Sequence, residues 1–318
     1  MTDHDLPPAE RDLVFICGAL RSGTTLLRLM INDHPGLSNP GEMDFLFEPP
    51  PMQDGRRDMA AYARELAYNR VVQKLALKFD QTLDYPDQVR AFVRQLQAPG
   101  KRLSINIHRH FDRIPEIFPA ARYVHLLRDP RDVAKSSIGM GWAGNAYHGV
   151  DHWIASERDF EKLAAIVPAK RIHRMRNEDL VRTPEQELAG LCAFLGVAYD
   201  PLMLDYPSHT TYGPPDPRLV EQWRNDATGR DLGLVEGKLG DMLASRGYAP
   251  SGAKVLRPGP VERFCLRTQD RWGRWRFMIR RNGLAVMAAD LVGRRLSIAP
   301  LAAYARRSKA AAAARHVK

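Results

Sequence analysis

The sequence of 318 residues predicts an α/β protein, with a parallel β-sheet flanked by helices and a basic, mostly helical C-terminal extension. Two segments carry this prediction. An apolar run at 13–18 leads through a glycine-bounded loop into a helix-like stretch at 24–34, and an apolar run at 123–127 leads through a turn into a helical stretch at 132–139. Strands that alternate with helices in this way form parallel sheets, whose ligand sites lie at the carboxyl ends of the strands.

The remaining segments fit the same architecture. We expect residues 1–11 to be a flexible N-terminus and residues 35–51, rich in Pro and Gly, to form a loop on the active-site side. Helical patterns occur within residues 57–97. Later in the chain the pattern predicts, in order, a helix near 151–166, a short strand at 171–175, and a helix at 184–195 that Gly196 ends as a C-cap.

The loop after the first strand has the composition of an anion site. Gly18 and Gly23 have the spacing of the nucleotide-binding pattern G-x-x-x-x-G-K-[ST], and the loop amides and the first N–H groups of the following helix converge on one point. Thr24 stands where that pattern has its phosphate-binding lysine, which leaves Arg21 as the cation of the loop. The sequence therefore predicts a phosphate-like ligand that is not the end of ATP. The alternative is a purely structural glycine turn.

The turn after the second strand reads Arg128-Asp-Pro-Arg-Asp and offers a second phosphate site. Arg128 at the end of the strand and Ser136 on the helix could hold one more phosphate, because an arginine presents a charged fork of donors. Alternatively, Arg128 pairs with Asp129 or Asp132 at the surface.

Three further side chains are candidates for acid–base chemistry. Glu42 lies in a Pro/Gly loop from which its carboxylate could return towards the anion site, although a solvated loop acid is the ordinary alternative. His108 and His110 would share one face of a strand, where they could line an acceptor pocket or supply an alternative base. Two ordinary polar histidines are the simpler interpretation. A zinc site is disfavoured because no third ligand is evident.

Together these segments resemble the sulfotransferases that use 3′-phosphoadenosine 5′-phosphosulfate (PAPS). The resemblance extends over about residues 12–250 and is nearest to the carbohydrate and tyrosylprotein branches of the family. It implies a P-loop NTPase-like fold for a sulfotransferase domain at 12–250, followed by the extension at 251–318. It is carried by Arg21-Ser-Gly-Thr-Thr, His34-Pro, Gly41-Glu, Arg128-Asp-Pro-Arg and Ser136.

The resemblance implies transfer of the sulfuryl group of PAPS to an acceptor hydroxyl by in-line displacement, with no metal. Glu42 would be the general base, and Arg21 would stabilise the developing charge. The implied acceptor is a carbohydrate, a glycolipid or another lipid-linked molecule, with a tyrosine also open. The 5′-phosphosulfate would be held by Arg21, Ser22, Gly23, Thr24 and Thr25, and the 3′-phosphate by Arg128 and Ser136.

The chain departs from the family pattern at two positions. Asn106 stands where many relatives carry a lysine, so that Arg21, Arg109 or Lys101 would have to supply the missing charge. Asn177 stands where an aromatic residue often precedes Glu-Asp-Leu, which puts stacking on the adenine at this position in doubt. The resemblance also places Trp223 in a region that the family uses as a lid or cofactor contact.

The charge of the chain is concentrated at its C-terminal end. The net charge is +10, and residues 251–318 contain 16 Lys/Arg against 3 Asp/Glu. Arginines interleaved with tryptophans favour an interfacial helix on anionic lipid. The alternatives are packing on the catalytic domain and binding of a polyanionic glycan, while nucleic acid is not expected.

The bulk composition fits a cytoplasmic enzyme with a peripheral contact at the inner face of the membrane. Three cysteines are too few for a disulfide framework, the first residues lack a secretory signal, and no apolar run approaches the roughly 20 residues that span a bilayer. Two other functions remain open. An ATP-dependent phosphotransferase is weakened by Thr24, and a catalytically silent nucleotide-binding protein would act at a membrane or polyanion through its basic tail.

Overall fold

The computed structural model describes residues 13–295 together with residues 300, 301, 304 and 308. The N-terminus 1–11 and nearly all of the alanine-rich stretch 308–318 lie outside the described residues. The chain divides into two compact units. The first contains the chain up to Asp129 and the segment His152–Val220, and the second contains Pro130–Asp151 and the chain from Glu221 onward. The division at residue 250 into a sulfotransferase domain and an extension stays a prediction.

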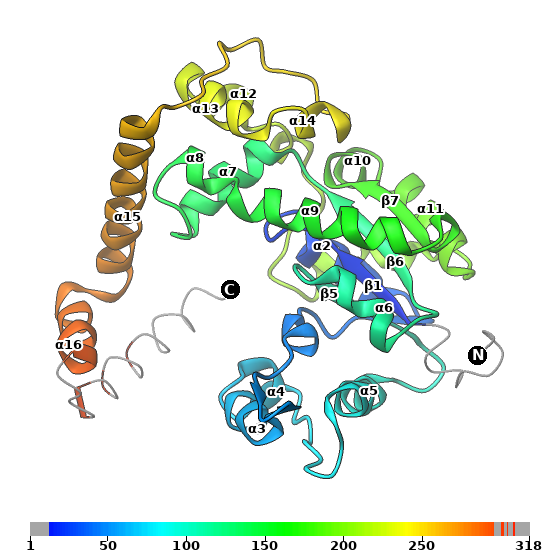
Figure 1. Ribbon diagram of the computed structural model, residues 1–318. Coiled ribbons are helices and arrows are strands. Elements are labelled where there is room, and N and C mark those ends of the chain that lie inside the picture. The colour runs from blue at the N-terminus through cyan, green and yellow to red at the C-terminus, as the bar shows by residue number, and fades with distance from the viewer. Residues whose placement is uncertain (1–12, 296–299, 302–303, 305–307, 309–318) are drawn as a thin grey trace. The chain divides into compact units, whose positions relative to one another are not determined.

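The first unit is built on a five-stranded parallel sheet with the strand order β2-β5-β1-β6-β7 (Figure 1). This confirms the predicted fold class. Its strands are β1 (Val14–Cys17), β2 (Leu37–Ser38), β5 (Arg102–Ile107), β6 (Arg122–Leu127) and β7 (Ile172–Arg176), and a separate antiparallel pair is formed by β3 (Met52–Gln53) and β4 (Arg56–Arg57). Its helices are α2 (Thr24–Asp33), α3 (Met59–Leu66), α4 (Arg70–Lys74), α5 (Tyr85–Leu96), α6 (Ile114–Ile117), α9 (Asp151–Ile166), α10 (Asn177–Arg182) and α11 (Pro184–Leu195), with 3₁₀ helices at Asp44–Phe47, Phe111–Arg113, Ala169–Arg171, Pro201–Leu204, Tyr206–Ser208 and Pro217–Leu219.

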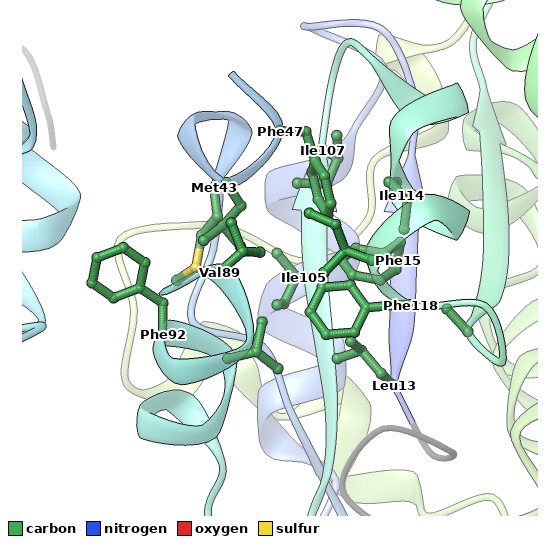
Figure 2. Packing of buried hydrophobic residues seen from close by; sticks show 14 of the residues in the cluster. Leu13, Phe15, Met43, Phe47, Val89, Phe92, Ile105, Ile107, Ile114 and Phe118 are labelled. Atoms are coloured by element: carbon green, nitrogen blue, oxygen red, sulfur yellow. The ribbon is translucent and has the colours of Figure 1, made fainter. Parts of the chain in front are cut away.

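Two hydrophobic cores lie on the two faces of the sheet, because successive side chains of a strand point to opposite faces. Phe15 of β1 faces the core formed with α5, α6 and α9, where it packs with Ile105, Phe47 and Phe118 (Figure 2). Ile16, the next residue, faces the other core, which α2, α10 and α11 complete. Apolar side chains therefore cover both faces of β1. This packing fixes the end of the strand, where the glycine loop begins.

Most predicted elements are confirmed, but two strands of the five-stranded sheet, β2 and β5, and the short pair β3 and β4 were not predicted. β1, α2, β6, α9, β7 and α11 lie where the sequence predicts them, and Gly196 ends α11 in a left-handed conformation with φ 73°. The segment 35–51 is not simply a loop, since it contains the two-residue edge strand β2 and a 3₁₀ helix. β5 escaped prediction because the buried polar residues Ser104 and Asn106 interrupt its apolar pattern.

The second unit is helical. It contains α7 (Pro130–Gly139), α8 (Ala146–Gly149), α12 (Trp223–Asp226), α13 (Gly229–Leu239), α14 (Met242–Ser245), α15 (Pro260–Asn282) and α16 (Leu284–Arg295). A buried ion pair joins its two chain segments, with Arg131 Nη1 2.9 Å from Glu236 Oε1. The helical nature of the C-terminal extension is thereby confirmed. In the part of the chain that the structure describes, no helix is long and apolar enough to cross a bilayer.

Candidate active site

The connection from β1 to α2 forms a cradle of backbone N–H groups. Arg21 and Gly23 both adopt left-handed conformations, with φ 72° and 91°, so the chain turns sharply before the helix begins. The first hydrogen bond of the helix runs from Leu27 N to Gly23 O, at 3.1 Å. The earlier N–H groups of α2 therefore have no partner inside the helix, and its first turn carries no acidic side chain. This arrangement favours a bound anion.

The two glycines of the loop are required by close packing. A Cβ atom on Gly18 would lie 2.6 Å from the carbonyl oxygen of Leu126, and one on Gly23 would lie 2.0 Å from Oδ1 of Asn177. Asn177, at the start of α10, is buried against the loop. In this structure it therefore has a packing role beside Gly23.

Two polar atoms at the cradle are buried without a hydrogen-bond partner. Ser22 is fully buried and its Oγ has none, and the same holds for Nε of Arg128. Buried polar groups are nearly always paired, and an unpaired one costs about 1–3 kcal/mol. Both atoms are suited to an anionic ligand, since a hydroxyl and a guanidinium N–H can each donate to a phosphate oxygen.

Arg128 joins the two predicted phosphate motifs. Its Nη1 donates to the carbonyl oxygen of Arg21 over 3.0 Å, and its own carbonyl oxygen accepts a hydrogen bond from Trp153 Nε1, also over 3.0 Å. The turn after β6 is thus tied directly to the glycine loop. Asp129 is buried, and its backbone N–H donates to Glu178, whose carboxyl has its pKa raised by burial.

The other predicted phosphate contacts lie on two different helices. Thr24 and Thr25 form the first turn of α2, where Thr25 is half-buried. Ser136 is half-buried on α7, in the second unit. Its assignment to the 3′-phosphate stays a prediction.

Glu42 is positioned by backbone pairing with the end of β5. Asn106 N donates to Gly41 O over 3.1 Å, and Met43 N donates to Asn106 O over 3.0 Å. The Glu42 side chain is 52% exposed, and its Oε1 lies 3.9 Å from Nε2 of His108. The carboxylate is therefore open to solvent and adjacent to a buried imidazole.

His108 belongs to a polar chain that the sequence indicated only in part. The backbone N–H of His108 donates to Asp44 Oδ1 over 2.7 Å, and its Nδ1 is 3.1 Å from Asp44 Oδ2. Because a carboxylate only accepts, the proton is assigned to Nδ1, which leaves Nε2 to accept from the Thr24 hydroxyl at 3.3 Å. Burial raises the pKa of Asp44, but its hydrogen bonds to His108 outweigh this and hold the pKa below its ordinary value.

Asp44 is the site residue that sequence reasoning missed. The strand register could have revealed it. Glu42 pairs in parallel with Asn106, so Asp44, two residues after Glu42, comes opposite His108, two residues after Asn106. The second histidine, His110, does not lie on the same strand face as His108. β5 ends at Ile107, and His110 has a left-handed φ of 60°, so the two histidines do not lie on one strand face. Burial also lowers the pKa of His110.

Asn106, at the position where the family resemblance implies a lysine, ties the cradle together. It is fully buried, its Nδ2 donates to Thr24 O over 3.1 Å, and its Oδ1 accepts from Asn39 over 2.9 Å. Lys101 precedes β5 at the opposite end of the strand, about 17 Å from Asn106 at the rise of a strand, so it cannot supply the missing charge. Arg109 pairs with Glu48. Of the three proposed substitutes, Arg21 is the one that the structure places in the loop.

Trp223 lies in the interior of the second unit. Its backbone N–H donates to Asp132 Oδ1 over 2.9 Å, and the Arg131 guanidinium lies 3.7 Å from the centroid of its ring. Arg131 and Asp132, in the first turn of α7, thereby serve the packing of this unit. Among the residues that the structure describes, no group of three or more His, Cys, Asp or Glu side chains could hold a metal ion.

Comparison with known proteins agrees with this geometry. Residues 13–201, more than half of the chain, match the model of the sulfotransferase family. The nodulation protein NoeE of Sinorhizobium fredii is 26% identical over 298 residues, which cover 79% of this chain and 69% of NoeE. The omega-hydroxy-beta-dihydromenaquinone-9 sulfotransferase Stf3 of Mycobacterium bovis is 27% identical over 164 residues, which cover 45% of this chain and 40% of Stf3.

A solved structure extends the likeness to the fold. The sulfotransferase domain of the Synechococcus PCC 7002 olefin synthase is 25% identical, with a TM-score of 0.54 over 70% of this chain and 93% of that one. One conclusion follows from the glycine cradle, from the arginine at the end of the neighbouring strand β6 that contacts it, and from the family match. The chain belongs to the sulfotransferase family.

Proposed function

We propose that this sulfotransferase moves the sulfuryl group of PAPS to an acceptor hydroxyl. The observation that carries the proposal is the pair of buried unpaired donors, Ser22 Oγ and Arg128 Nε, beside a cradle of free N–H groups. In this assignment the loop from Arg21 to Thr25 holds the 5′-phosphosulfate, and Arg128 with Ser136 holds the 3′-phosphate. A ligand with anionic groups at both ends satisfies both motifs, whereas ATP has none at its 3′ end.

The residues of the loop support transfer by positioning and charge. PAPS supplies a sulfuryl group bonded to a phosphate leaving group, so an in-line displacement needs little more than alignment. The N–H groups at the start of α2 and the Arg21 guanidinium would stabilise the charge that develops on the oxygens of the transferred and leaving groups. Removal of one such preorganised donor typically costs about 10²–10³-fold in rate.

Glu42 is proposed as the general base that accepts the proton of the acceptor. Its carboxylate is half-exposed, so an incoming hydroxyl can reach it. His108, fixed by Asp44, would hold the Glu42 side of the site in place. The second candidate for the base is His108 itself, because its unprotonated Nε2 could accept a proton once it releases the Thr24 hydroxyl.

The identity of the base is tested with two variants. Glu42→Gln is expected to lower turnover about 10²–10⁴-fold, the usual contribution of a general base, with little change in affinity for the cosubstrate product. His108→Asn is expected to have the smaller effect. If Glu42→Gln keeps full turnover while His108→Asn abolishes it, the role passes to His108.

We propose a carbohydrate, a glycolipid or another lipid-linked hydroxyl as the acceptor. The name of Stf3 records sulfation of a hydroxylated menaquinone, which supports a lipid-linked hydroxyl as one acceptor class. The acceptor is identified by incubating the full chain with ³⁵S-labelled PAPS and extract of the source cell, followed by mass spectrometry of the labelled product. Glu42→Gln serves as the control reaction.

The cosubstrate is tested by thermal unfolding with 3′-phosphoadenosine 5′-phosphate (PAP) and with ATP. We expect PAP to raise the Tm of the wild-type chain and to raise that of Arg128→Ala much less. Stabilisation by ATP alone would contradict the proposed cosubstrate. Stabilisation by PAP without label transfer to any fraction of the extract would favour a catalytically silent nucleotide-binding protein instead.

A further inference from the structure

The long helix α15 has two different faces, and among the residues that the structure describes only one of them packs against protein. Leu266 and Asp270 are buried, and with Glu262, Gly273 and Phe277 they form a stripe at helical spacing that faces the rest of the second unit. On this side Asn145 Nδ2 donates to Leu266 O over 2.7 Å, and Gly144 N donates to Asp270 Oδ1 over 2.7 Å. The inner side of α15 is therefore packed against other residues of the second unit.

The opposite side of α15 exposes large apolar side chains. The positions 261, 264, 268, 272, 275 and 279 follow one another at intervals of three and four residues, which places them along a single outward stripe. Of these, Val261 is 78% exposed, Phe264 69% and Trp272 62%, and Trp275 stacks on Trp272 with ring centroids 5.9 Å apart. Figure 1 shows α15 as one continuous helix. We call this stripe the outer face of α15.

The next helix adds to the exposed apolar surface. α16 contacts α15 and buries Val286 and Asp290, whereas Leu284 and Leu291 are more than half exposed and Val292 is 39% exposed. Exposed aromatic and aliphatic side chains thus occur on both helices. An apolar surface of this kind marks an interaction site.

Arginines flank the outer face on both sides. Helical periodicity places Arg267, Arg271 and Arg274 along one flank and Arg276 and Arg280 along the other, and all five are exposed. Both acidic residues of α15 are already paired, Glu262 with Arg230 and Asp270 with Arg274. The apolar stripe is consequently bordered by positive charge with little acidic charge to offset it.

We propose that the outer face of α15 docks on a lipid bilayer with an anionic surface. Tryptophan rings prefer the boundary between acyl chains and headgroups, and arginines on the flanks of a helix bind lipid phosphates. A helix that lies in the plane of the interface needs this arrangement: an apolar stripe on one side, cations at its borders, and a polar or protein-covered remainder. A nucleic acid would use the arginines but would not require two aliphatic positions and a phenylalanine in the same stripe.

Vesicle binding by the full chain tests this proposal. We expect cosedimentation with vesicles of phosphatidylcholine and phosphatidylglycerol, at least tenfold weaker binding to pure phosphatidylcholine, and weakening by salt. The double variant Trp272→Ala/Trp275→Ala is expected to lose at least tenfold in affinity for the mixed vesicles. Tyr68→Ala is the matched control, because Tyr68 is an 85% exposed aromatic residue of the first unit and its removal should change nothing.

A spectroscopic readout separates docking from a general charge effect. Brominated acyl chains should quench the tryptophan fluorescence of the wild type. The conservative variant Trp272→Phe/Trp275→Phe should still bind the vesicles but lose most of this quenching. Equal binding to neutral and anionic vesicles, or unchanged binding by the Trp→Ala pair, would overturn the proposal. So would a dimer that the Trp→Ala pair dissociates in the absence of any vesicle binding, because the outer face would then be an interface between two copies.

Discussion

The two strand-to-helix connections at the site have the same local pattern and opposite uses of their polar groups. After β1, the loop Gly18–Gly23 leaves Ser22 Oγ and the first N–H groups of α2 without protein partners. After β6, the turn commits Asp129 to Glu178, Arg131 to Glu236 and Asp132 to Trp223. Arg128 stands between the two, with one guanidinium nitrogen on Arg21 O and another unpaired.

The difference shows that a charged motif does not reveal which of its residues bind a ligand. The two arginines of the Arg128–Arg131 turn are three residues apart, yet one reaches the cradle and the other is buried in an ion pair. In the proposed assignment the unpaired buried donors, Ser22 Oγ and Arg128 Nε, lie on the ligand side of the site. Completed buried pairs mark the supporting structure.

The largest expected effect separates these two arginines. Arg131→Ala leaves Glu236 as a buried uncompensated charge and is expected to lower the free energy of unfolding by about 3–5 kcal/mol. Arg128→Ala should lower stability far less but weaken PAP binding about 10–100-fold, the usual value of a charged hydrogen bond. Urea unfolding and PAP titration measure both. Arg218→Ala, which removes an exposed arginine paired with the partly exposed Asp216, is the control for loss of charge. The comparison fails if Arg131→Ala is as stable as the wild type.

The next effect concerns the shape of the loop. Gly23→Ala combines a left-handed φ of 91° with a clash against Asn177, and we expect it to cost about 1–3 kcal/mol of stability and to abolish PAP-dependent stabilisation. Gly55→Ala is a matched control, because Gly55 has a φ of 75° and nothing within 4 Å of the added atom. Adding Asn177→Ala to Gly23→Ala should recover part of the lost stability. Equal losses in the two single glycine variants would show that Asn177 does not constrain the loop.

A smaller effect of opposite sign is expected at Ser22. Ser22→Ala removes an unpaired buried hydroxyl, so it should raise the free energy of unfolding by about 1 kcal/mol while weakening PAP binding about tenfold. The matched substitution in the helix after the other turn is Ser137→Ala, since the fully buried Ser137 Oγ donates to Val133 O over 2.7 Å. Ser137→Ala should leave PAP affinity unchanged and should not stabilise the chain. A destabilised Ser22→Ala protein would indicate that the hydroxyl has a structural role.

The smallest effect is a change in pH dependence. The pKa of Asp44 is lowered in the folded state, so its contribution to stability is complete above the pKa of the unfolded chain and is lost as the pH falls through the folded value. Unfolding measured between pH 6 and pH 3 should show a steeper acid loss for the wild type than for Asp44→Asn. Asp54→Asn, at an exposed loop carboxylate, is the surface control. Parallel curves for the wild type and Asp44→Asn would mean that the His108–Asp44 pair does not stabilise the fold.

The sequence was sufficient to predict the frame of the site. β1 is a continuous apolar run that ends before Gly18, and β6 is mainly apolar, with His125 as its one interior polar residue, and ends before Arg128; such sequences are typical of strands buried on both faces. β5 is the other neighbour of β1 in the sheet, but its polar residues Ser104 and Asn106 conceal it in the sequence, because Asn39, which hydrogen-bonds to both, is far away in the chain. The two-residue strand β2 is too short to leave a periodic signal.

The polar chain beside Glu42 depends on contacts between residues far apart in the sequence. His108 and Asp44 are separated by 64 residues, and no local sequence pattern predicts that their side chains pair. The same applies to Arg131, whose partners Glu236 and Ala249 O lie more than 100 residues away. Sequence motifs identified the proposed phosphate contacts as candidates, whereas Asp44 and the partners of Arg131 emerged only from the register of the sheet and from the packing within the second unit.

The way in which α15 is built into the second unit has a practical consequence for shortened versions of the chain. The side chain of Asn145 and the backbone N–H of Gly144 both find their acceptors on this helix, and Gly273 passes directly against the backbone of Gly144. Ending the polypeptide before residue 260 would remove these acceptors from the segment that follows α7. A truncated chain is therefore expected to express as a less stable protein, and the basic end is better studied by point substitution than by deletion.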